Sequence, residues 1–226
     1  MAHPSRARNP RSHFAFALLA LSTAFGSGAA AGEDTYYPTA EGTLWEYSAR
    51  YSTPDHLGIP PRSGRRIERL EGREEHDGKT YLRFSSTLEG IGTEPVTGRS
   101  LLRVAEGGVY FRTDASAEDT LGLPLPPLVG HTWSSSNDWG EWRGTVTREL
   151  AIETPAGRFE SCVEVSTELV EPSTASRGRL SQQTTYCRGV GPVQRVMTTE
   201  SEGPAGPIRG VTEETLTRTT REEPTR

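Results

Sequence analysis

Residues 154–193 read TPAGRFESCVEVSTELVEPSTASRGRLSQQTTYCRGVGPV, and the organisation of this stretch decides the fold. Residues 154–157 form a tight-turn signal, and the run after them alternates apolar with polar side chains, which is the period of a β-strand. A polar loop at 171–179 leads to a second expected strand that ends at Cys187. Residues 189–193 mark a break and a new strand. The stretch therefore predicts consecutive β-strands joined by turns and a loop.

The N-terminus has the pattern of a secretory signal peptide. Three arginines within the first eleven residues precede an apolar segment, 14–25, that is too short for a stable membrane span. Three alanines end at Ala31 and fit the small-residue cleavage pattern, so we expect a signal peptide at residues 1–31. The alternative is an uncleaved anchor. No cysteine lies near the cut, so we expect an exported protein, periplasmic or extracellular, without a lipid anchor.

The charge of the chain argues against a nucleic-acid partner. Cleavage would remove three arginines and no acidic residue, which takes the formal net charge from −5 to −8. Nucleic-acid phosphates require clustered Lys and Arg on the protein. No second apolar run follows the signal, so we expect no membrane span in the mature chain. The expected partner is a small molecule, a glycan or another protein.

Cys162 and Cys187 are the only cysteines. An even number of cysteines in an exported protein is usually paired, and two distant cysteines without a nearby histidine make a poor metal site. We therefore predict a disulfide between them. Chain-entropy arithmetic for a loop of about 25 residues gives an upper figure of about 3–4 kcal/mol of stabilisation.

The remainder of the mature chain predicts an all-β domain. No long segment after the signal has the 3.6-residue period of a helix. Short alternating runs are separated by turn residues, with hairpin signals at Asp77–Gly78 and Gly107–Gly108. The stretch 121–129 is rich in Pro and Leu and cannot be a central strand. Further strands are expected at 43–51, 65–70, 80–87, 101–104, 109–112, 142–152 and 208–216.

A weak internal repeat divides this domain into two similar halves. Residues 38–45 have the pattern Pro-x-x-x-Gly-x-x-Trp, and residues 126–133 repeat it with identical spacing. Each half is expected to be a meander opened by a proline turn and a buried tryptophan. The halves lie at about 36–118 and 119–218.

Half-sheets of that size bury little apolar surface alone, so we expect them to merge. The fold expected for residues 32–218 is a single curved antiparallel sheet or open barrel-like meander, closed late by the Cys162–Cys187 bridge. The alternative is two small β domains that meet near residues 121–129. Residues 219–226 are polar and charged and are expected to be disordered.

Three sequence motifs resemble a group of bacterial exported proteins and lipoproteins to which no activity is assigned. The motifs are Tyr36-Tyr37-Pro38-x-x-x-Gly42-x-x-Trp45-x-Tyr47, Thr154-Pro-Ala-Gly-x-Phe159-x-x-Cys162-x-x-Val165 and Tyr186-x-x-Gly189-Val190-Gly191. The resemblance covers nearly all of the mature chain, and its motifs are turns, a tryptophan and strand starts. It implies an extracytoplasmic β-rich domain and no catalytic residue.

Catalytic and metal-binding patterns are missing from the sequence. The mature histidines, His56, His76 and His131, form no His-x-His or His-Glu-x-x-His arrangement. No Gly-x-Ser-x-Gly turn, phosphate-binding glycine loop or calcium-binding loop is present. Carboxylates are numerous but scattered along strands. We therefore expect no metal, no cofactor and no identifiable catalytic residue.

Residues 133–142, WSSSNDWGEW, concentrate aromatic side chains. Trp133, Trp139 and Trp142 could form a stacking platform for a sugar ring or an apolar ligand, with His131 facing the same cleft. The alternative places Trp133 in the core, Trp142 pointing inward from a strand and Trp139 exposed at a turn. These four residues are the candidate ligand-binding residues.

Three functions are compatible with these features. The preferred one is an exported, non-enzymatic binding or interaction protein whose concave sheet face holds an apolar small molecule or a lipid. The second is a carbohydrate-binding module that uses the tryptophans of residues 133–142. The third is a hydrolase with dispersed acidic residues or His131.

Overall fold

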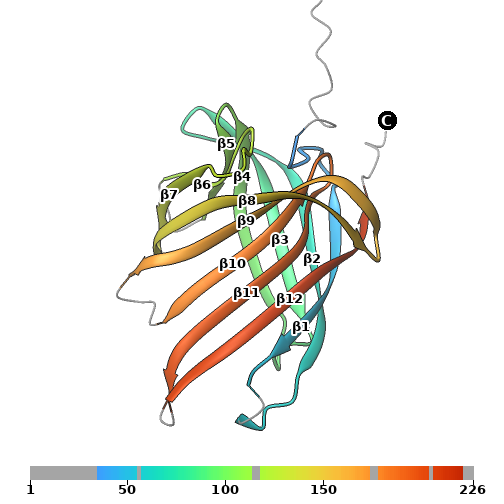
Figure 1. The fold of residues 1–226 in the computed structure, drawn as a ribbon. Coiled ribbons are helices and arrows are strands. Elements are labelled where there is room, and N and C mark those ends of the chain that lie inside the picture. The colour runs from blue at the N-terminus through green and yellow to red at the C-terminus, as the bar shows by residue number, and fades with distance from the viewer. Residues whose placement is uncertain (1–34, 55–56, 114–117, 174–177, 204–205, 221–226) are drawn as a thin grey trace, which may run out of the picture.

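The computed structural model describes residues 35–54, 57–113, 118–173, 178–203 and 206–220. These residues form twelve β-strands and no α-helix, and all the strands belong to one antiparallel sheet (Figure 1). The predicted all-β class is thereby confirmed. The expected signal peptide at residues 1–31 lies outside the described residues.

The strands follow one another along the sheet as two meanders. Their bounds are β1 (Leu44–Ser52), β2 (Arg62–His76), β3 (Lys79–Glu89), β4 (Val96–Ala105), β5 (Gly108–Arg112), β6 (Thr120–Pro124), β7 (Thr132–Asn137), β8 (Gly140–Thr154), β9 (Gly157–Pro172), β10 (Arg179–Cys187), β11 (Gly191–Gly203) and β12 (Gly206–Thr220). The order across the sheet is β6-β5-β4-β3-β2-β1-β12-β11-β10-β9-β8-β7. The first and second halves of the chain are therefore joined by the pairing of β1 with β12.

The sheet curls until its two end strands, β6 and β7, lie near each other. No backbone ladder joins them among the described residues. Instead, the indole N–H of Trp133 donates to the carbonyl of Leu121 at 3.2 Å, and the hydroxyl of Thr120 donates to the carbonyl of Ser136 at 3.0 Å. We call this contact between β6 and β7 the seam. The result is a nearly closed barrel, which confirms the expected curved sheet or open barrel (Figure 1).

The two copies of the Pro-x-x-x-Gly-x-x-Trp pattern make the same turn at the start of β1 and of β7. Gly42 and Gly130 both adopt positive φ, 77° and 87°, which favours glycine. Four equivalent backbone hydrogen bonds follow: Gly42 N–H to Leu70 O and Leu70 N–H to Thr43 O, and Gly130 N–H to Val146 O and Val146 N–H to His131 O. The repeat is therefore structural. Strand β6 pairs with β5 and so lies beside the strands of the first copy of the pattern.

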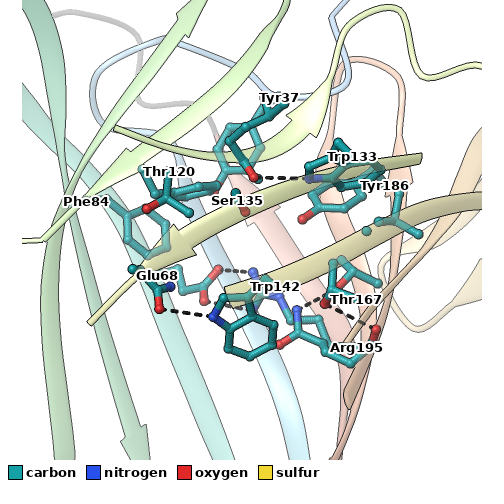
Figure 2. A pocket seen from close by; sticks show the side chains of 18 residues that line it. Tyr37, Glu68, Phe84, Thr120, Trp133, Ser135, Trp142, Thr167, Tyr186 and Arg195 are labelled. Atoms are coloured by element: carbon teal, nitrogen blue, oxygen red, sulfur yellow. Dashed lines mark hydrogen bonds and ion pairs between the residues drawn. The ribbon is translucent and has the colours of Figure 1, made fainter. Parts of the chain in front are cut away.

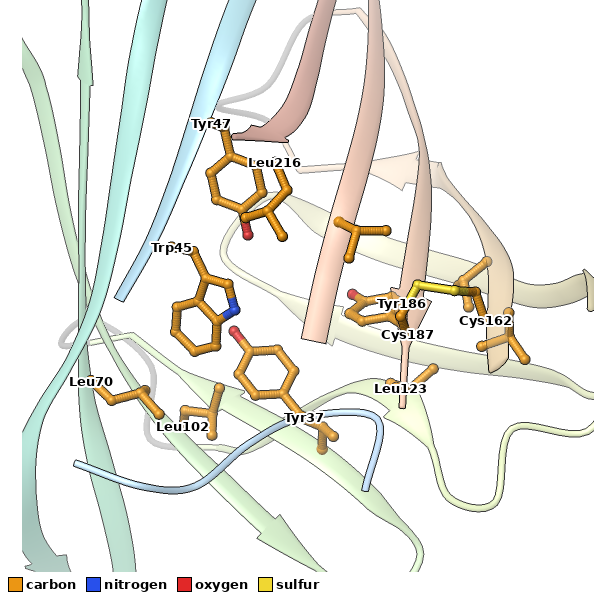
Figure 3. Packing of buried hydrophobic residues seen from close by; sticks show 14 of the residues in the cluster. Tyr37, Trp45, Tyr47, Leu70, Leu102, Leu123, Cys162, Tyr186, Cys187 and Leu216 are labelled. Atoms are coloured by element: carbon orange, nitrogen blue, oxygen red, sulfur yellow. A yellow bond between two sulfur atoms is a disulfide. The ribbon is translucent and has the colours of Figure 1, made fainter. Parts of the chain in front are cut away.

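The apolar core fills the end of the barrel at which β1 begins and β12 ends. Trp45 and Tyr47 are its largest fully buried side chains on β1 (Figure 3). The Trp45 indole donates to the carbonyl of Val190 at 2.7 Å, and the Tyr47 hydroxyl donates to the carbonyl of Pro192 at 2.9 Å. Both rings are therefore buried with their polar atoms satisfied. Around them pack Tyr37, Leu70, Leu82, Leu102, Val109, Leu123, Val146, Val163, Val165, Tyr186, Val193 and Leu216.

Cys162 on β9 and Cys187 on β10 lie directly opposite each other and form the predicted disulfide, with their Cα atoms 4.0 Å apart. The expectation that this bridge closes the sheet is wrong. The bridge joins two neighbouring strands that a backbone ladder already connects, and the sheet closes at the seam instead.

Most strands extend beyond their expected bounds, as β2 and β4 do beyond 65–70 and 101–104, and two differences concern whole segments. Residues 132–137, which no apolar alternation marks, form β7 because they pair with β8 in a hairpin. Strand β12 continues to Thr220, because Thr219 and Thr220 pair with Trp45 and Leu44. The expected disordered tail at 219–226 therefore begins with two strand residues. The Pro-Leu stretch contributes β6 at one end of the sheet, as its proline content predicts.

Candidate functional site

The inward-facing side chains change from apolar to polar on moving away from the core. Side chains of a strand alternate between the two faces of the sheet, so every second residue points into the barrel. On β2 the inward-facing residues are Leu70, then Glu68, then Arg66. The same change from apolar to charged occurs from Val193 to Arg195 on β11 and from Leu216 to Glu214 on β12. The middle of the barrel is therefore lined by charged and polar groups.

Four of these side chains form one ion-pair network. Arg195 donates from Nη1 and Nη2 to the two carboxylate oxygens of Glu68, both at 2.7 Å, and from Nη1 to Glu214 at 3.2 Å. Arg66 donates from Nε to the other oxygen of Glu214 at 2.7 Å and from Nη1 to the hydroxyl of Ser86 at 2.8 Å. Both carboxylates are buried. The network contains two positive and two negative charges, and each charge faces an opposite one.

The environment keeps Arg195 charged. Burial alone would lower the pKa of this guanidinium, but the carboxylates of Glu68 and Glu214 together with Tyr47 raise it well above its ordinary value. The guanidinium also lies over the ring of Tyr47, 4.9 Å from its centroid. Burial in turn raises the pKa of the Tyr47 hydroxyl well above its usual range, so this group stays protonated.

Beside the network lies a cavity of about 260 Å³, which we call the aromatic chamber (Figure 2). Its aromatic walls are Tyr37, Phe84, Phe111, Trp133, Trp142 and Tyr186. Its polar lining consists of Glu68, Thr120, Ser135, Asn137, Thr167, Gln182, Thr184 and Arg195. Residues of both end strands of the sheet contribute, so the aromatic chamber lies directly behind the seam.

Hydrogen bonds fix both indoles of the aromatic chamber. Trp142 Nε1 donates to Asn137 Oδ1 at 3.0 Å, and the same oxygen accepts the backbone N–H of Trp139 at 2.9 Å. Trp133 Nε1 donates to the carbonyl oxygen of Leu121 at the seam. Since both indole N–H groups bind protein acceptors, the rings offer their apolar surfaces to the aromatic chamber.

Two glycines make room for the aromatic walls. A Cβ atom at Gly144 would lie 2.2 Å from the indole of Trp133, and a Cβ at Gly122 would lie 2.5 Å from the ring of Phe111. These rings therefore pack closely against the backbone of the neighbouring strand. Any side chain at either glycine would push an aromatic ring away from the wall.

A second, smaller cavity of about 190 Å³ lies on the other side of the network, and we call it the charged chamber. Its lining consists of Arg66, Glu68, Gln182, Arg195, Met197, Thr212 and Glu214. Glu68, Gln182 and Arg195 line both chambers. The two chambers therefore share one polar wall.

The structure separates the four residues that the sequence singled out. Trp133 and Trp142 line the aromatic chamber. Trp139 is 59% exposed at the β7–β8 turn, and His131 is exposed with its ring 6.3 Å from that of Trp133. Neither Trp139 nor His131 lines the aromatic chamber.

The charged residues of the site, Glu68, Arg195, Arg66 and Glu214, are not among the residues predicted from the sequence. A usable signal exists, because Arg195 shares its strand parity with Val193 and Met197, and Glu214 shares its parity with Leu216. A charged residue that shares its parity with apolar residues is compatible with a buried polar site, but parity alone does not distinguish it from a solvated face. Within the described ranges, no three side chains of the types His, Cys, Asp and Glu gather as metal ligands. Among the same residues, no helix is long and apolar enough to cross a membrane.

No protein-family model and no curated protein matches the chain. Two solved structures resemble it at low sequence identity. One is a candidate exported protein with a YmcC-like fold from Bacteroides fragilis, at 13% identity and TM-score 0.49, covering 83% of this chain and 99% of that one. The other is a candidate lipoprotein from Parabacteroides distasonis, at 13% identity and TM-score 0.46, with the same coverage. Likeness at this level transfers no site residue.

Proposed function

We propose that this is an exported, non-enzymatic binding protein that holds a compact molecule in the aromatic chamber. The carrying observation is a cavity with aromatic walls and a polar floor inside a barrel whose other end is filled by core side chains. A concave, mostly apolar cavity with a few convergent polar groups is the usual form of a small-molecule site.

The size of the aromatic chamber limits the ligand. Sites that bury drug-sized molecules occupy about 300–1,000 Å³, so a cavity of about 260 Å³ suits a compact molecule or the end group of a larger one. A purely apolar ligand would cover Glu68, Gln182 and Asn137 without offering hydrogen bonds, which is unfavourable. An amphipathic ligand therefore fits better than the acyl chain of a lipid.

The arrangement of carboxylates favours binding over hydrolysis. The two buried carboxylates, Glu68 and Glu214, both accept hydrogen bonds from arginines on each oxygen. A general acid or base must exchange a proton with the ligand, and the oxygens of both carboxylates are already occupied by guanidinium N–H donors. His131 lies outside the aromatic chamber.

Export is supported by the signal-peptide pattern and by the disulfide, since disulfides persist in oxidising compartments. The mature protein would therefore meet its ligand outside the cytoplasmic membrane. Fractionation of the native host distinguishes retention in the periplasm from release into the medium.

Native mass spectrometry of the mature protein purified from its own host, with organic extraction of any bound molecule, tests this function. We expect a stoichiometric adduct. The matched variants are Ser135→Phe, which places a ring in the aromatic chamber, and Ser134→Phe, which places it on the exposed face of the same strand. The adduct should disappear in Ser135→Phe and persist in Ser134→Phe. A bare protein that also takes up nothing from a host extract would refute the proposal.

A further inference from the structure

We propose that the ligand of the aromatic chamber is an uncharged sugar unit, a compact ring with several hydroxyl groups; this inference rests on the proposed function. Three features of the site carry it: the balance of charge, the two engaged indoles and a set of neutral polar groups without protein partners.

The charge balance excludes a charged ligand. The aromatic chamber is lined by one carboxylate, Glu68, and one guanidinium, Arg195, which are bonded to each other at both oxygens. The charged chamber adds Arg66 and Glu214, which are also bonded to each other. The four charges cancel. A ligand with a net charge would lie in this cavity without a free counter-ion, and removing an unpaired charge from water is costly.

The two indoles favour a ring with an apolar face. Trp133 and Trp142 come from neighbouring strands and line the same chamber (Figure 2). Because both N–H groups are bound by protein acceptors, what remains for the ligand is aromatic carbon. The C–H face of a sugar ring packs well against such a surface, while its hydroxyl groups point sideways.

The neutral polar groups of the chamber favour hydroxyl groups on that ring. Gln182 donates from Nε2 to the hydroxyl of Thr184 at 2.8 Å, and the described residues supply no donor for its side-chain oxygen. The Ser135 hydroxyl, and the side-chain nitrogen of Asn137, likewise find no protein partner in the described part of the chain. A flat aromatic ligand would bury these groups without hydrogen-bond partners, whereas sugar hydroxyls can both donate and accept.

Gln182 lies between the two chambers, and its position determines how a ligand would be oriented in the site. It lines both the aromatic and the charged chamber together with Glu68 and Arg195. A ring packed on Trp142 would therefore turn its hydroxyl edge toward this shared polar wall.

A matched sugar series tests the inference. The purified mature protein is titrated with glucose, N-acetylglucosamine, glucuronate and glucosamine by calorimetry and tryptophan fluorescence. The neutral sugars should bind at least about tenfold more tightly than the anionic and cationic ones, because only the charged ones bring an unpaired charge. Glu68→Gln gives the cavity a net positive charge and should shift the preference toward glucuronate.

Two adjacent glutamines supply the control. Gln182→Ala, in the chamber, should weaken neutral-sugar binding at least about tenfold, whereas Gln183→Ala, on the exposed face of the same strand, should leave it unchanged. Equal effects of the two variants, or equal binding of neutral and charged sugars, would overturn the inference.

The outcomes also separate this inference from the proposed function. A non-sugar adduct in native mass spectrometry, with no sugar bound in titration, overturns the sugar class and leaves the binding function standing. No adduct and no sugar binding overturns both.

Discussion

Arg195 and Glu68 are joined by two parallel hydrogen bonds of 2.7 Å, although 127 residues separate them in sequence. They come from β11 and β2, on opposite sides of the β1–β12 pair that unites the two halves of the barrel. The bidentate pair therefore ties the halves together through the interior. It also forms the wall that the two chambers share.

Removing one member of this pair should destabilise the barrel strongly. Glu68 is 3% exposed, so Glu68→Gln leaves a buried guanidinium with one carboxylate fewer, and such a loss typically lowers the free energy of unfolding by about 3–5 kcal/mol. The control Glu71→Gln, at an exposed position on the same strand, should change it by less than about 0.5 kcal/mol. Urea unfolding followed by circular dichroism measures both. An unchanged midpoint for Glu68→Gln would contradict this role.

The double variant Glu68→Leu with Arg195→Met separates the charge from the packing. Replacing both partners of a buried pair by apolar residues is often neutral, whereas removing one is not. The double variant should therefore unfold at a higher urea concentration than either single variant. A strictly additive loss would mean that the two side chains do not act as a pair.

Asp119 should make the barrel sensitive to acid. Burial alone would raise the pKa of this carboxyl, but hydrogen bonds from Tyr81, Arg103 and Lys79 outweigh it and hold the pKa at about 2. A carboxyl with a lowered pKa stabilises the fold above its unfolded pKa, about 3.9, and loses this contribution as the pH falls toward 2. The contribution is on the order of 2 kcal/mol.

The measurement is the free energy of unfolding of the wild type and Asp119→Asn between pH 2 and pH 6, a range set by the titration of carboxyl groups at about pH 4. The wild type should lose stability below about pH 4, and the variant should lose less over the same interval. Asp138→Asn is the control, because Asp138 is exposed at the β7–β8 turn and forms no ion pair among the described residues. Parallel pH profiles for wild type and Asp119→Asn would refute the assignment.

The sequence predicts the course of the strands better than it predicts the site. The hairpin at Asp77–Gly78 and the turns at Gly42 and Gly130 are local, so short motifs suffice to find them. The pairing of Arg195 with Glu68 depends on strands that lie far apart in the chain, and a charged residue in a strand reads equally well as part of a solvated face. Nothing local in the sequence states which face is concave.

The place at which the barrel closes was likewise not predictable from the sequence. The repeated Pro-x-x-x-Gly-x-x-Trp pattern indicates two equivalent turns, but the seam between β6 and β7 follows from the accumulated curl of the whole sheet. The disulfide is easy to predict because the chain has two cysteines. That it joins two neighbouring, already paired strands could not be predicted from the sequence. The clustering of tryptophans at residues 133–142 singles out Trp133 and Trp142 as site residues, but the same cluster includes the exposed Trp139.

Gly144 should be essential to the aromatic chamber. Gly144→Ala places a Cβ 2.2 Å from the indole of Trp133, so the ring must move off the wall. Overpacking of this kind typically costs about 1–3 kcal/mol. We expect a shift in tryptophan fluorescence and loss of any bound adduct. Gly98→Ala is the matched control, because a Cβ on this strand glycine meets no atom within 4 Å; a similar response from both variants would contradict the prediction.

The seam should be the part of the sheet that opens most readily. Strand β1 pairs with β12 along nine residues, whereas described contacts between β6 and β7 include side-chain hydrogen bonds but no backbone ladder. Amide hydrogens that lack a ladder exchange through local opening that needs little free energy. Amides of β6 and β7 should therefore exchange faster than those of β1 and β12. Trp133→Phe removes the indole donor to Leu121 and should raise exchange in β6 and β7 alone, while Trp139→Phe should not. Uniform exchange along the whole sheet would mean that the seam is closed as firmly as the ladders.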